Sequence, residues 1–257
     1  MKTLVFSEMD QIAFIKLNRP DVRNAFNSEM IEELTQTFLG LQARTDLKAV
    51  ALSGDGKVFC AGADLNWMKS MVNFSFEENK KDSEKLYEMF AAMKNLDLPI
   101  IGHVHGAVFG GALGLVACCD YIVAEMGTKF CFSEVKLGIA PAVISSFVLD
   151  KTTPAVKYYM TSADVFTEVQ GAQLGLVNYA GSKEDATKEL QRVLQLYKDN
   201  GPVAVRRTKK LLRDLAKLSP NQHKDITTGL IAELRVSNEG QEGIKGFLEN
   251  RKPSWKA

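Results

Sequence analysis

Short apolar runs that alternate with segments of helical periodicity constrain the fold of this chain more than any other feature. The runs are IAFIKL (12–17), AVALSG (49–54), PIIGHVHG (99–106) and YIVA (121–124). After Asn27, which can cap a helix, apolar residues recur at steps of three and four, so a helix with one buried face separates the first two runs. Strands that alternate with helices form a largely parallel sheet with crossover helices. The sequence therefore predicts an α/β fold.

The second half of the chain has a different character. We expect it to be mostly helical from Ala142, with a brief strand in GLVNYA (175–180) and a capping box formed by Thr167 and Gln170. Between 65 and 94 the pattern is also helical, with a break near 73–75. After DNGP (199–202) the pattern is helical to the end, so we place a domain boundary near residue 200.

Composition excludes several classes of function. The 257 residues carry 32 basic and 31 acidic side chains, and this balance argues against nucleic acid or an acidic membrane as the main partner. No apolar run reaches membrane-spanning length, and the first twenty residues lack the apolar segment of a secretory signal. Four cysteines without a CxxC pair, and three histidines without zinc spacing, predict reduced structural thiols and no metal site. We therefore expect a cytoplasmic protein.

Glycine spacing rules out the common nucleotide and hydrolase motifs. Gly106, Gly110, Gly111 and Gly114 are separated by 4, 1 and 3 residues, which is not the dinucleotide fingerprint GxGxxG. The chain also lacks the phosphate loop GxxxxGK[ST] and the nucleophile elbow GxSxG. Nucleotide hydrolysis and serine-hydrolase chemistry therefore have little support.

Two glycine loops remain, each between a predicted strand and a predicted helix: CAGAD (60–64) and GAVFGGALG (106–114). The first N–H groups of a helix have no internal acceptor, and glycine lets a ligand approach the backbone closely. Two such loops can direct two N–H donors at one oxygen, which is how an oxyanion hole is built. The alternative interpretation is a pair of tight turns that allow close helix packing.

Several stretches, taken together, resemble one enzyme family. FCAGADL, HGAVFGGALGL and FSEVKLGIAP follow in order, between an opening IKLNRPDVRNAFNSEM and a closing GIKGFLENRKPSW. This combination is similar to the crotonase (enoyl-CoA hydratase/isomerase) superfamily over almost the whole chain. The segments GADLNWMKSM and SEVKLGIAPAVIS are most similar to those of bacterial methylglutaconyl-CoA hydratase-like members, which act on branched acyl-CoA in leucine degradation.

The resemblance implies a fold, an assembly and a substrate class. The fold would be a spiral of β-β-α units over residues 1–200, with a helical region at 201–257 that packs into trimers or into hexamers made of two trimers. The substrate would be a coenzyme A thioester, so coenzyme A arrives as part of the substrate and no separate cofactor is required.

The resemblance also implies which residues form the site. The oxyanion donors would be the N–H groups of Ala63 and Gly111. The substrate-binding residues would be Ala63, Asp64, Leu65, Asn66, Trp67, Gly110 and Gly111, with the first four bordering the adenine and pantetheine arm. Trp67, Met68 and Met71 would either shape an acyl pocket or simply pack their helix.

One expected acid is missing. Hydratases of this family that use two acids carry one Glu in the helix after the glycines and a second in the PE or SE motif. Here the first position is Gly114 and the second is Glu134. Glu134 lies among apolar residues, so we expect burial to raise its pKa toward the neutral range that suits acid–base exchange.

Three functions remain open at this point. The first is an enoyl-CoA hydratase in which Glu134 serves as both base and acid. The second is a Δ3,Δ2-enoyl-CoA isomerase, because one carboxylate is sufficient for a 1,3-proton shift. The third is a non-catalytic acyl-CoA-binding subunit. The basic run RRTKKLLR (206–213) is expected to be a solvated helix face rather than a phosphate site, and His103 and His105 to be core or edge residues rather than bases.

Overall fold

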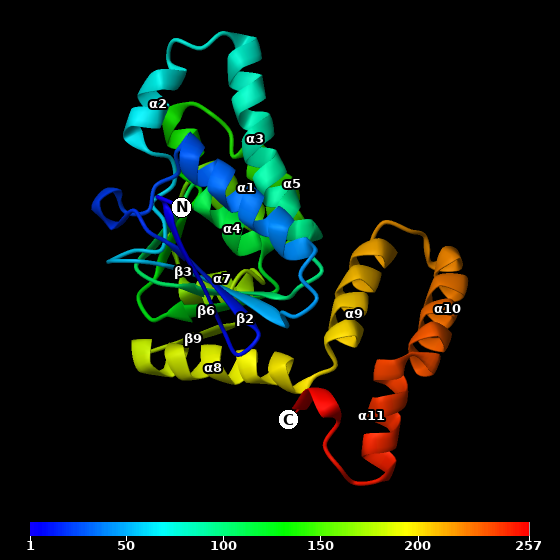
Figure 1. The fold of residues 1–257 in the computed structure, drawn as a ribbon. Coiled ribbons are helices and arrows are strands. Elements are labelled where there is room, and N and C mark those ends of the chain that lie inside the picture. Colours follow the sequence, from blue (N-terminus) through cyan, green and yellow to red (C-terminus); the bar gives the residue numbers. More distant parts are fainter. Residues whose placement is uncertain (257) are drawn as a thin grey trace.

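The computed structural model describes residues 1–256, which form two sheets with helices around them (Figure 1). The larger sheet has the order β1-β2-β3-β4-β6-β9, and every neighbouring pair except β1–β2 is parallel. Its strands are β1 (Leu4–Met9), β2 (Ile12–Leu17), β3 (Ala49–Gly54), β4 (Ile100–Val104), β6 (Tyr121–Glu125) and β9 (Tyr179–Gly181). The predicted parallel α/β sheet is confirmed.

A second, smaller sheet explains how distant loops come together. Its strands are β5 (Ala107–Phe109), β7 (Lys129–Cys131) and β8 (Phe166–Thr167), with β5 parallel to β7 and β7 antiparallel to β8. Two isolated bridges, Phe26 with Ala63 and Cys60 with Val108, carry the same pairing back to earlier turns of the chain. The chain thus repeats one path: a strand of the large sheet comes first, and a segment paired in the smaller ladder follows. The corresponding segments of successive repeats therefore lie next to one another.

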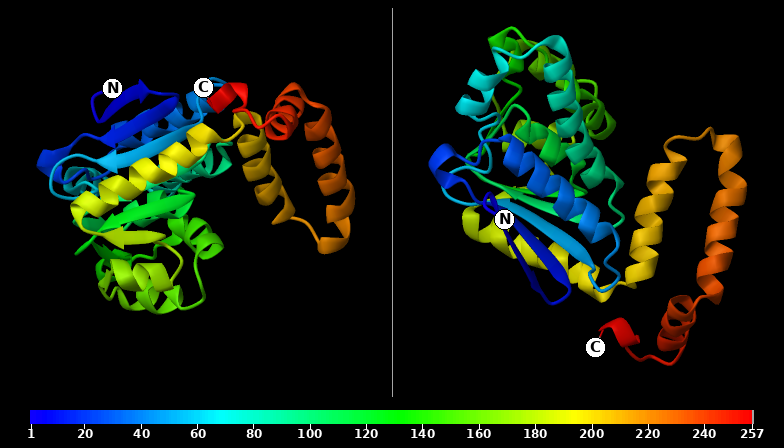
Figure 2. Two further views of the ribbon diagram at one scale, coloured as in Figure 1. Left: turned by 90° about the horizontal axis from the view of Figure 1, so that it is seen from below. Right: turned by 45° about the horizontal axis from the view of Figure 1, so that its top comes forward.

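Helices cover both faces of the large sheet (Figures 1 and 2). One face is covered by α1 (Ser28–Gln42), α3 (Phe76–Asn95), α4 (Ala112–Cys118) and α5 (Ala142–Lys151), and the other by α8 (Lys183–Asp199). Along β2, Ala13, Ile15 and Leu17 join the main core, whereas Ile12 packs with Val193 of α8. This division follows from the two-residue period of side chains in a strand.

Shorter helices complete the body, by which we mean residues 1–199. They are α2 (Leu65–Met71), α6 (Val156–Ser162), α7 (Glu168–Gln173) and the 3-10 turns η1 (Pro20–Val22) and η2 (Glu134–Leu137). The break between α2 and α3 lies where the sequence predicted it. The capping box of Thr167 and Gln170 is also confirmed.

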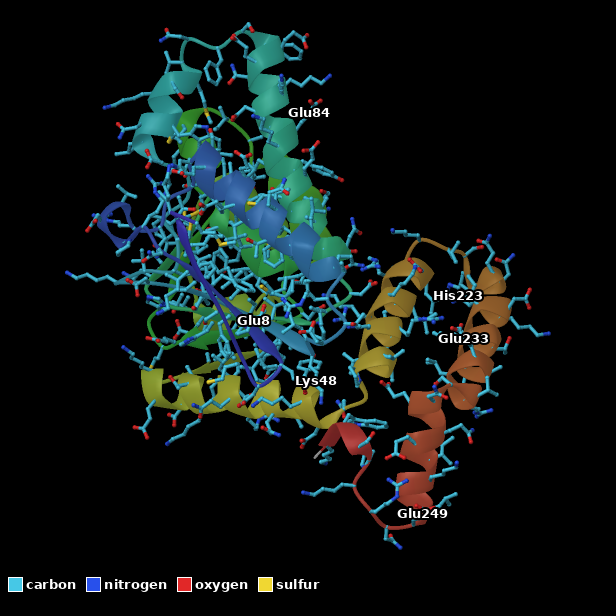
Figure 3. All side chains as sticks on the ribbon, in the orientation of Figure 1. Glu8, Lys48, Glu84, His223, Glu233 and Glu249 are labelled. Carbon is cyan, nitrogen blue, oxygen red and sulfur yellow. The ribbon has the colours of Figure 1, made fainter. Side chains whose placement is uncertain are left out.

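The last helices stand apart from the body as an arm, defined here as residues 202–248 (Figures 1 and 2). The arm consists of α9 (Pro202–Leu215), η3 (Pro220–Gln222), α10 (His223–Val236) and α11 (Asn238–Leu248). The chain then returns through η4 (Ser254–Lys256) to the point where the arm leaves. There, the Nζ of Lys48 donates to the carbonyls of Lys198 and Trp255 at 2.5 and 2.7 Å. Figure 3 shows Lys48 at this junction and His223 and Glu233 far from the body.

One expected strand differs from the structure. Residues 175–178 are not a strand, and β9 begins only at Tyr179. Gly175 has a φ of +87°, and the amides of Leu176 and Val177 donate to the carbonyl of Gly171. The segment therefore closes the end of α7 as a turn, although its apolar residues resemble a strand. Within residues 1–256, no helix combines the length and the apolar character that crossing a bilayer requires.

Candidate active site

The first glycine loop runs alongside β5. Cys60 donates its N–H to the carbonyl of Ala107 at 3.1 Å and accepts from the N–H of Phe109 at 3.1 Å. Gly62 has a φ of +94°, and a Cβ at this position would lie 2.9 Å from the carbonyl oxygen of Phe109. Glycine is therefore required here both by the left-handed backbone and by the close approach of the second loop.

The amide of Ala63 is left free by the pairing on either side of it. Phe26 donates its N–H to the carbonyl of Gly62 at 2.7 Å and accepts from the N–H of Asp64 at 2.8 Å. Successive amides of an extended segment point in opposite directions, so the N–H of Ala63 points away from Phe26. In the described part of the chain this N–H donates to no acceptor, and Ala63 is exposed. It is therefore available to a ligand.

The second loop presents a similar donor at the start of α4. Gly110 has a φ of +54° and donates its N–H to the carbonyl of Cys131 at 2.9 Å. Gly111 follows as the N-cap of α4, and its N–H has no acceptor among residues 1–256. A Cβ on Gly111 would lie 3.4 Å from Cε2 of Phe26. Phe26 thus contacts both loops, with its backbone on the first and its ring on the second.

Glu134 lies beside the second of these two loops. It is the first residue of η2, and a Cβ on Gly110 would be 3.5 Å from Oε1 of Glu134. Its Oε2 is buried and has no hydrogen-bond partner within the described residues. Burial raises the pKa of the Glu134 carboxyl above its ordinary value, as the sequence predicted. Its Oε2 can exchange a proton with a bound molecule because no protein group among the described residues is bonded to that oxygen.

Gly114, the position of the missing acid, has no room for a side chain. A Cβ there would lie 2.5 Å from Cζ of Phe90 and 2.8 Å from Cγ2 of Ile144. Phe90 comes from α3 and is completely buried. Sequence reasoning missed this residue. Its only signal was the apolar spacing of Met89, Phe90 and Met93, which indicates a buried helix face but not what that face touches.

Asp64 stabilises the start of α2 and the loop before it. Its carboxylate accepts from the N–H of Asn66 at 2.7 Å and of Trp67 at 3.3 Å, which caps α2, and it is paired with Arg19 at 2.8 Å. Burial acts to raise the pKa of Asp64, but the bonds from Asn66, Arg19 and Trp67 hold it below its ordinary value. Arg19 also donates to the carbonyl of Ala25 at 2.6 Å, so it ties the chain before α1 to the first loop.

The remaining predicted residues lie on α2. Leu65 and Asn66 are exposed next to Ala63, and Trp67 is half-buried and packs against the main core. Met68 and Met71 are half-buried on the same short helix. The structure therefore gathers Ala63, the α2 residues, Gly110, Gly111 and Glu134 around one end of the stacked ladder.

Asn24 is a positioning residue that sequence reasoning did not single out. It is fully buried with a φ of +55°, and its Nδ2 donates to the carbonyls of Asp55, Val58 and Phe59 at 2.7 to 3.1 Å. Its Oδ1 accepts from the N–H of Arg19 at 2.9 Å. Asn24 thus fixes the approach to the first glycine loop, and the left-handed backbone it tolerates is typical of asparagine.

The prediction for the basic run is wrong at three positions. Arg206, Lys209 and Arg213 do not face solvent but reach back to the body. They donate to the carbonyls of Leu47, Leu98 and Asn95, respectively, at 2.8 to 2.9 Å. Lys209 and Arg213 also form ion pairs with Asp120 and Asp97. Their spacing places them on one face of α9, and this face is what joins the arm to the body.

The two histidines behave as expected of core or edge residues. Nε2 of His103 lies 3.2 Å from Oε1 of Glu125, and burial lowers the pKa of His103 although Glu125 opposes this. His105 is bonded through Nε2 to the carbonyl of Gly56 at 3.0 Å.

A groove of about 1090 Å³ lies elsewhere, between α9 and the body, and none of the predicted site residues lines it. Within residues 1–256 no cluster of His, Cys, Asp or Glu has the arrangement of a metal site.

Comparison with known proteins identifies the family of this chain and agrees with its fold. The profile of the enoyl-CoA hydratase/isomerase family matches residues 7–257. The chain belongs to this family. Its fold is the crotonase fold, and membership of this family of enzymes argues against the non-catalytic alternative. A crystal structure of an enoyl-CoA hydratase from Shewanella pealeana is 35% identical, with a TM-score of 0.93 over 98% of this chain and 96% of that one.

Two curated relatives show the range of reactions in the family. A crotonyl-CoA hydratase from Syntrophomonas wolfei is 25% identical, over 99% of this chain and 98% of its own. A trans-2-decenoyl-[acyl-carrier-protein] isomerase from Streptococcus mutans is 24% identical, over 99% of this chain and 98% of its own. Family membership therefore leaves both hydration and isomerisation as candidate reactions.

Proposed function

We propose that this protein adds water reversibly across the 2,3 double bond of an enoyl-CoA, with Glu134 as the acid/base and the amides of Ala63 and Gly111 as oxyanion donors. The observation that carries the proposal is the buried, unpartnered Oε2 of Glu134 beside two unpaired N–H groups. A buried carboxylate oxygen normally has a partner, so its isolation here favours a group that receives a proton from substrate or water.

In the proposed mechanism the thioester oxygen accepts hydrogen bonds from both amides. Glu134 removes a proton from water, the water oxygen bonds to Cβ, and the electron pair of the double bond moves onto the thioester oxygen. Glu134 then returns the same proton to Cα, which restores the carbonyl. One oxyanion donor stabilises such a transition state by about 3 kcal/mol. The raised pKa of Glu134 suits a group that must both take and give a proton.

A second candidate is a Δ3,Δ2-enoyl-CoA isomerase, which the glycine at position 114 favours. Here Glu134 would take a proton from C2 of a 3-enoyl thioester and return it at C4, so the double bond moves without any gain of water. The oxyanion donors would stabilise the same enolate. Only one carboxylate is needed for this reaction.

For the substrate, we propose a branched acyl chain such as that of methylglutaconyl-CoA. The pantetheine and adenine parts would lie along Ala63, Asp64, Leu65 and Asn66, and Trp67 and Gly110 would complete the binding site. Leu65 is 74% exposed, which is consistent with an apolar side chain that contacts a bound ligand. Support for branching comes from the sequence resemblance alone.

Mass spectrometry on a panel of straight, branched and carboxylated enoyl-CoAs tests these assignments. The proposal expects a 2-enoyl-CoA to gain the mass of one water and to lose the absorbance of its conjugated thioester. A 3-enoyl-CoA converted to the 2-enoyl isomer with no gain of water would instead support the isomerase. Turnover of neither class would contradict both.

We also propose that residues 201–257 form an oligomerisation region that assembles trimers or pairs of trimers. The support is apolar surface on the arm, where Val236, Phe247 and Leu248 are each more than 70% exposed. Phe247 and Leu248 adjoin in the chain, and adjoining exposed apolar residues mark an interaction surface more often than scattered ones do. Analytical ultracentrifugation of the wild type and of Phe247→Asp tests this. We expect a trimer or hexamer in the first and smaller species in the second, and a monomeric wild type would contradict the proposal.

A further inference from the structure

We infer that Phe90 is a positioning residue that occupies the place of a second acid and so confines proton transfer to Glu134. The catalytic part of this inference rests on the proposed function, whereas the packing part stands by itself. Two positions, Gly114 and Phe90, then explain why the site has a single carboxylate. The sequence alone indicates only the missing acid at Gly114.

The position of Gly114 places it close to the reacting groups. Gly114 donates its N–H to the carbonyl of Gly111 at 2.9 Å, so it lies one helical turn after the oxyanion donor. Residues three apart in a helix lie on the same side, with about 5–6 Å between their Cβ positions. A carboxylate on residue 114 would therefore project from the same side of α4 as the donor, close to the substrate that the donor binds.

The ring of Phe90 already fills the space into which such a side chain would grow. Its Cζ and Cε1 are 2.5 and 2.6 Å from an ideal Cβ on Gly114, and the Cγ2 of Ile144 closes the other side at 2.8 Å. Carbon atoms that are not bonded to one another do not approach this closely, because the optimum is about 3.5–4.0 Å. Even alanine at position 114 must displace the ring, and glutamate must displace it further.

The ring cannot move aside easily. Phe90 is fully buried, and its ring centroid lies 5.5 Å from that of Phe147 on α5. The carbonyl of Phe90 accepts from Sγ of Cys118 at 3.5 Å, so its backbone is also joined to the end of α4. Phe90 is thus held between α3, α4 and α5, and a packed interior of this kind resists added volume.

A stability cycle tests the packing part of the inference. We expect Gly114→Ala to lower the melting temperature by roughly 3–10 °C, since overpacking costs about 1–3 kcal/mol. In a Phe90→Ala background the same change should cost less, because the two closest contacts of the methyl group, both with the ring, are gone and only the contact with Ile144 remains. Gly40→Ala is the matched control, because that helical glycine has nothing within 4 Å of an added Cβ. An equal loss with and without the ring of Phe90 would overturn the inference.

A pH profile tests the catalytic part. With an enoyl-CoA that the wild type hydrates, we expect kcat/KM of the wild type and of Phe90→Ala to follow one ionisation. In Phe90→Ala/Gly114→Glu a second ionisation should appear, with hydration at least about tenfold faster than in Phe90→Ala, because a second general acid becomes available. A double variant with the profile and rate of Phe90→Ala would overturn this part.

Two further variants, Phe90→Leu and Glu134→Gln, serve as controls for these experiments. Phe90→Leu leaves a smaller cavity, and it gives the same cycle if Phe90→Ala does not fold. Glu134→Gln separates this inference from the proposed function. Full activity in Glu134→Gln would contradict the proposed function while the melting cycle still reports on Phe90. Inactive Glu134→Gln together with an unchanged double-variant profile would contradict only the role of Phe90.

Discussion

The body and the arm are held in place by different forces, and the difference shows where each kind of function lies. In the body, apolar side chains from α1, α3, α4 and α5 form one continuous core under the candidate site. In the arm, no residue of α9 or α10 is fully buried. Arg206, Lys209 and Arg213 join α9 to the body through carbonyls and carboxylates. The candidate site therefore lies in the tightly packed body, whereas the arm exposes large apolar side chains such as Val236 and Phe247.

Energetics make this contrast testable. Full burial of a Leu or Phe side chain contributes about 1.5–3 kcal/mol, whereas an ion pair near the surface contributes about 0–1 kcal/mol. An isolated chain should therefore lose the arm before it loses the body. The following four predictions test this contrast with matched changes in the two regions.

The largest effect is expected from a matched pair of leucines. Leu34 of α1 is completely buried, and Leu212 of α9 is 63% exposed. Leu34→Ala should lower the free energy of unfolding by about 2–5 kcal/mol, because it leaves a cavity in the core. Leu212→Ala should change the unfolding of the body by less than about 0.5 kcal/mol. Chemical denaturation measures both, and similar losses would show that the arm is as well packed as the body.

A smaller effect is expected from polar anchors. Asn24→Ala should cost about 1–3 kcal/mol, since it leaves the buried carbonyl of Phe59 and two part-buried carbonyls without their donor. It should also lower kcat, because the loop that carries Ala63 loses its support. Arg213→Met should cost about 1 kcal/mol or less and leave kcat unchanged. Denaturation curves and initial rates distinguish the two variants, and an unaltered kcat in Asn24→Ala would contradict a positioning role.

Opposite pH dependences are expected in the two regions. Burial raises the pKa of Glu134, so its ionisation above about pH 4.5 opposes folding. Glu134→Gln should therefore be more stable than the wild type near pH 7, and the gain should vanish below about pH 4. In the arm, the hydrogen bond from Arg207 lowers the pKa of Glu233, so that pair favours folding fully above the ordinary pKa of a glutamate and loses this effect as the pH falls through the lowered pKa.

The arm variant Glu233→Gln should accordingly loosen α9 and α10 near pH 7, and this effect should disappear as the pH falls through the lowered pKa of Glu233. Thermal melts follow the body, and hydrogen exchange of variant and wild type at the same pH follows the arm. A destabilised Glu134→Gln at neutral pH would contradict the burial argument.

The smallest effect is expected from two glycines in open surroundings. Gly40 in α1 and Gly229 in α10 have nothing within 4 Å of an added Cβ. Alanine at either position should stabilise its helix by about 0.5–1 kcal/mol. Gly40→Ala should raise global stability, whereas Gly229→Ala should slow hydrogen exchange only in the arm. A global gain from Gly229→Ala would show that the two regions unfold together.

Local patterns predicted much of this structure. The strands β2, β3, β4 and β6 and the break before α3 follow from apolar runs and helical periodicity, which depend only on nearby residues. The strand β1 was not predicted. The two glycine loops and Glu134 were identified from short motifs that resemble one family, and the structure places them side by side. The burial that raises the pKa of Glu134 followed from the apolar residues around it in the sequence.

Contacts between distant segments were not predictable in the same way. The small sheet consists of strands only two or three residues long, which are too short to show a pattern. Phe90 faces Gly114 across two helices, and no feature of either segment indicates that contact. The three cations of α9 have the spacing of a solvated helix face, and only the position of the body reveals that they bind carbonyls.

The hydration rate of Glu134→Gln tests the central claim most directly. The substitution keeps the size of the side chain and removes its ability to exchange a proton. Glu189→Gln on α8, whose carboxylate is bonded to Tyr121 and Arg192 on the opposite face of the sheet, is the matched control. With a 2-enoyl-CoA that the wild type hydrates, we predict that kcat falls by about 10²–10⁴-fold in Glu134→Gln and stays unchanged in Glu189→Gln. Wild-type kcat in Glu134→Gln would contradict the account.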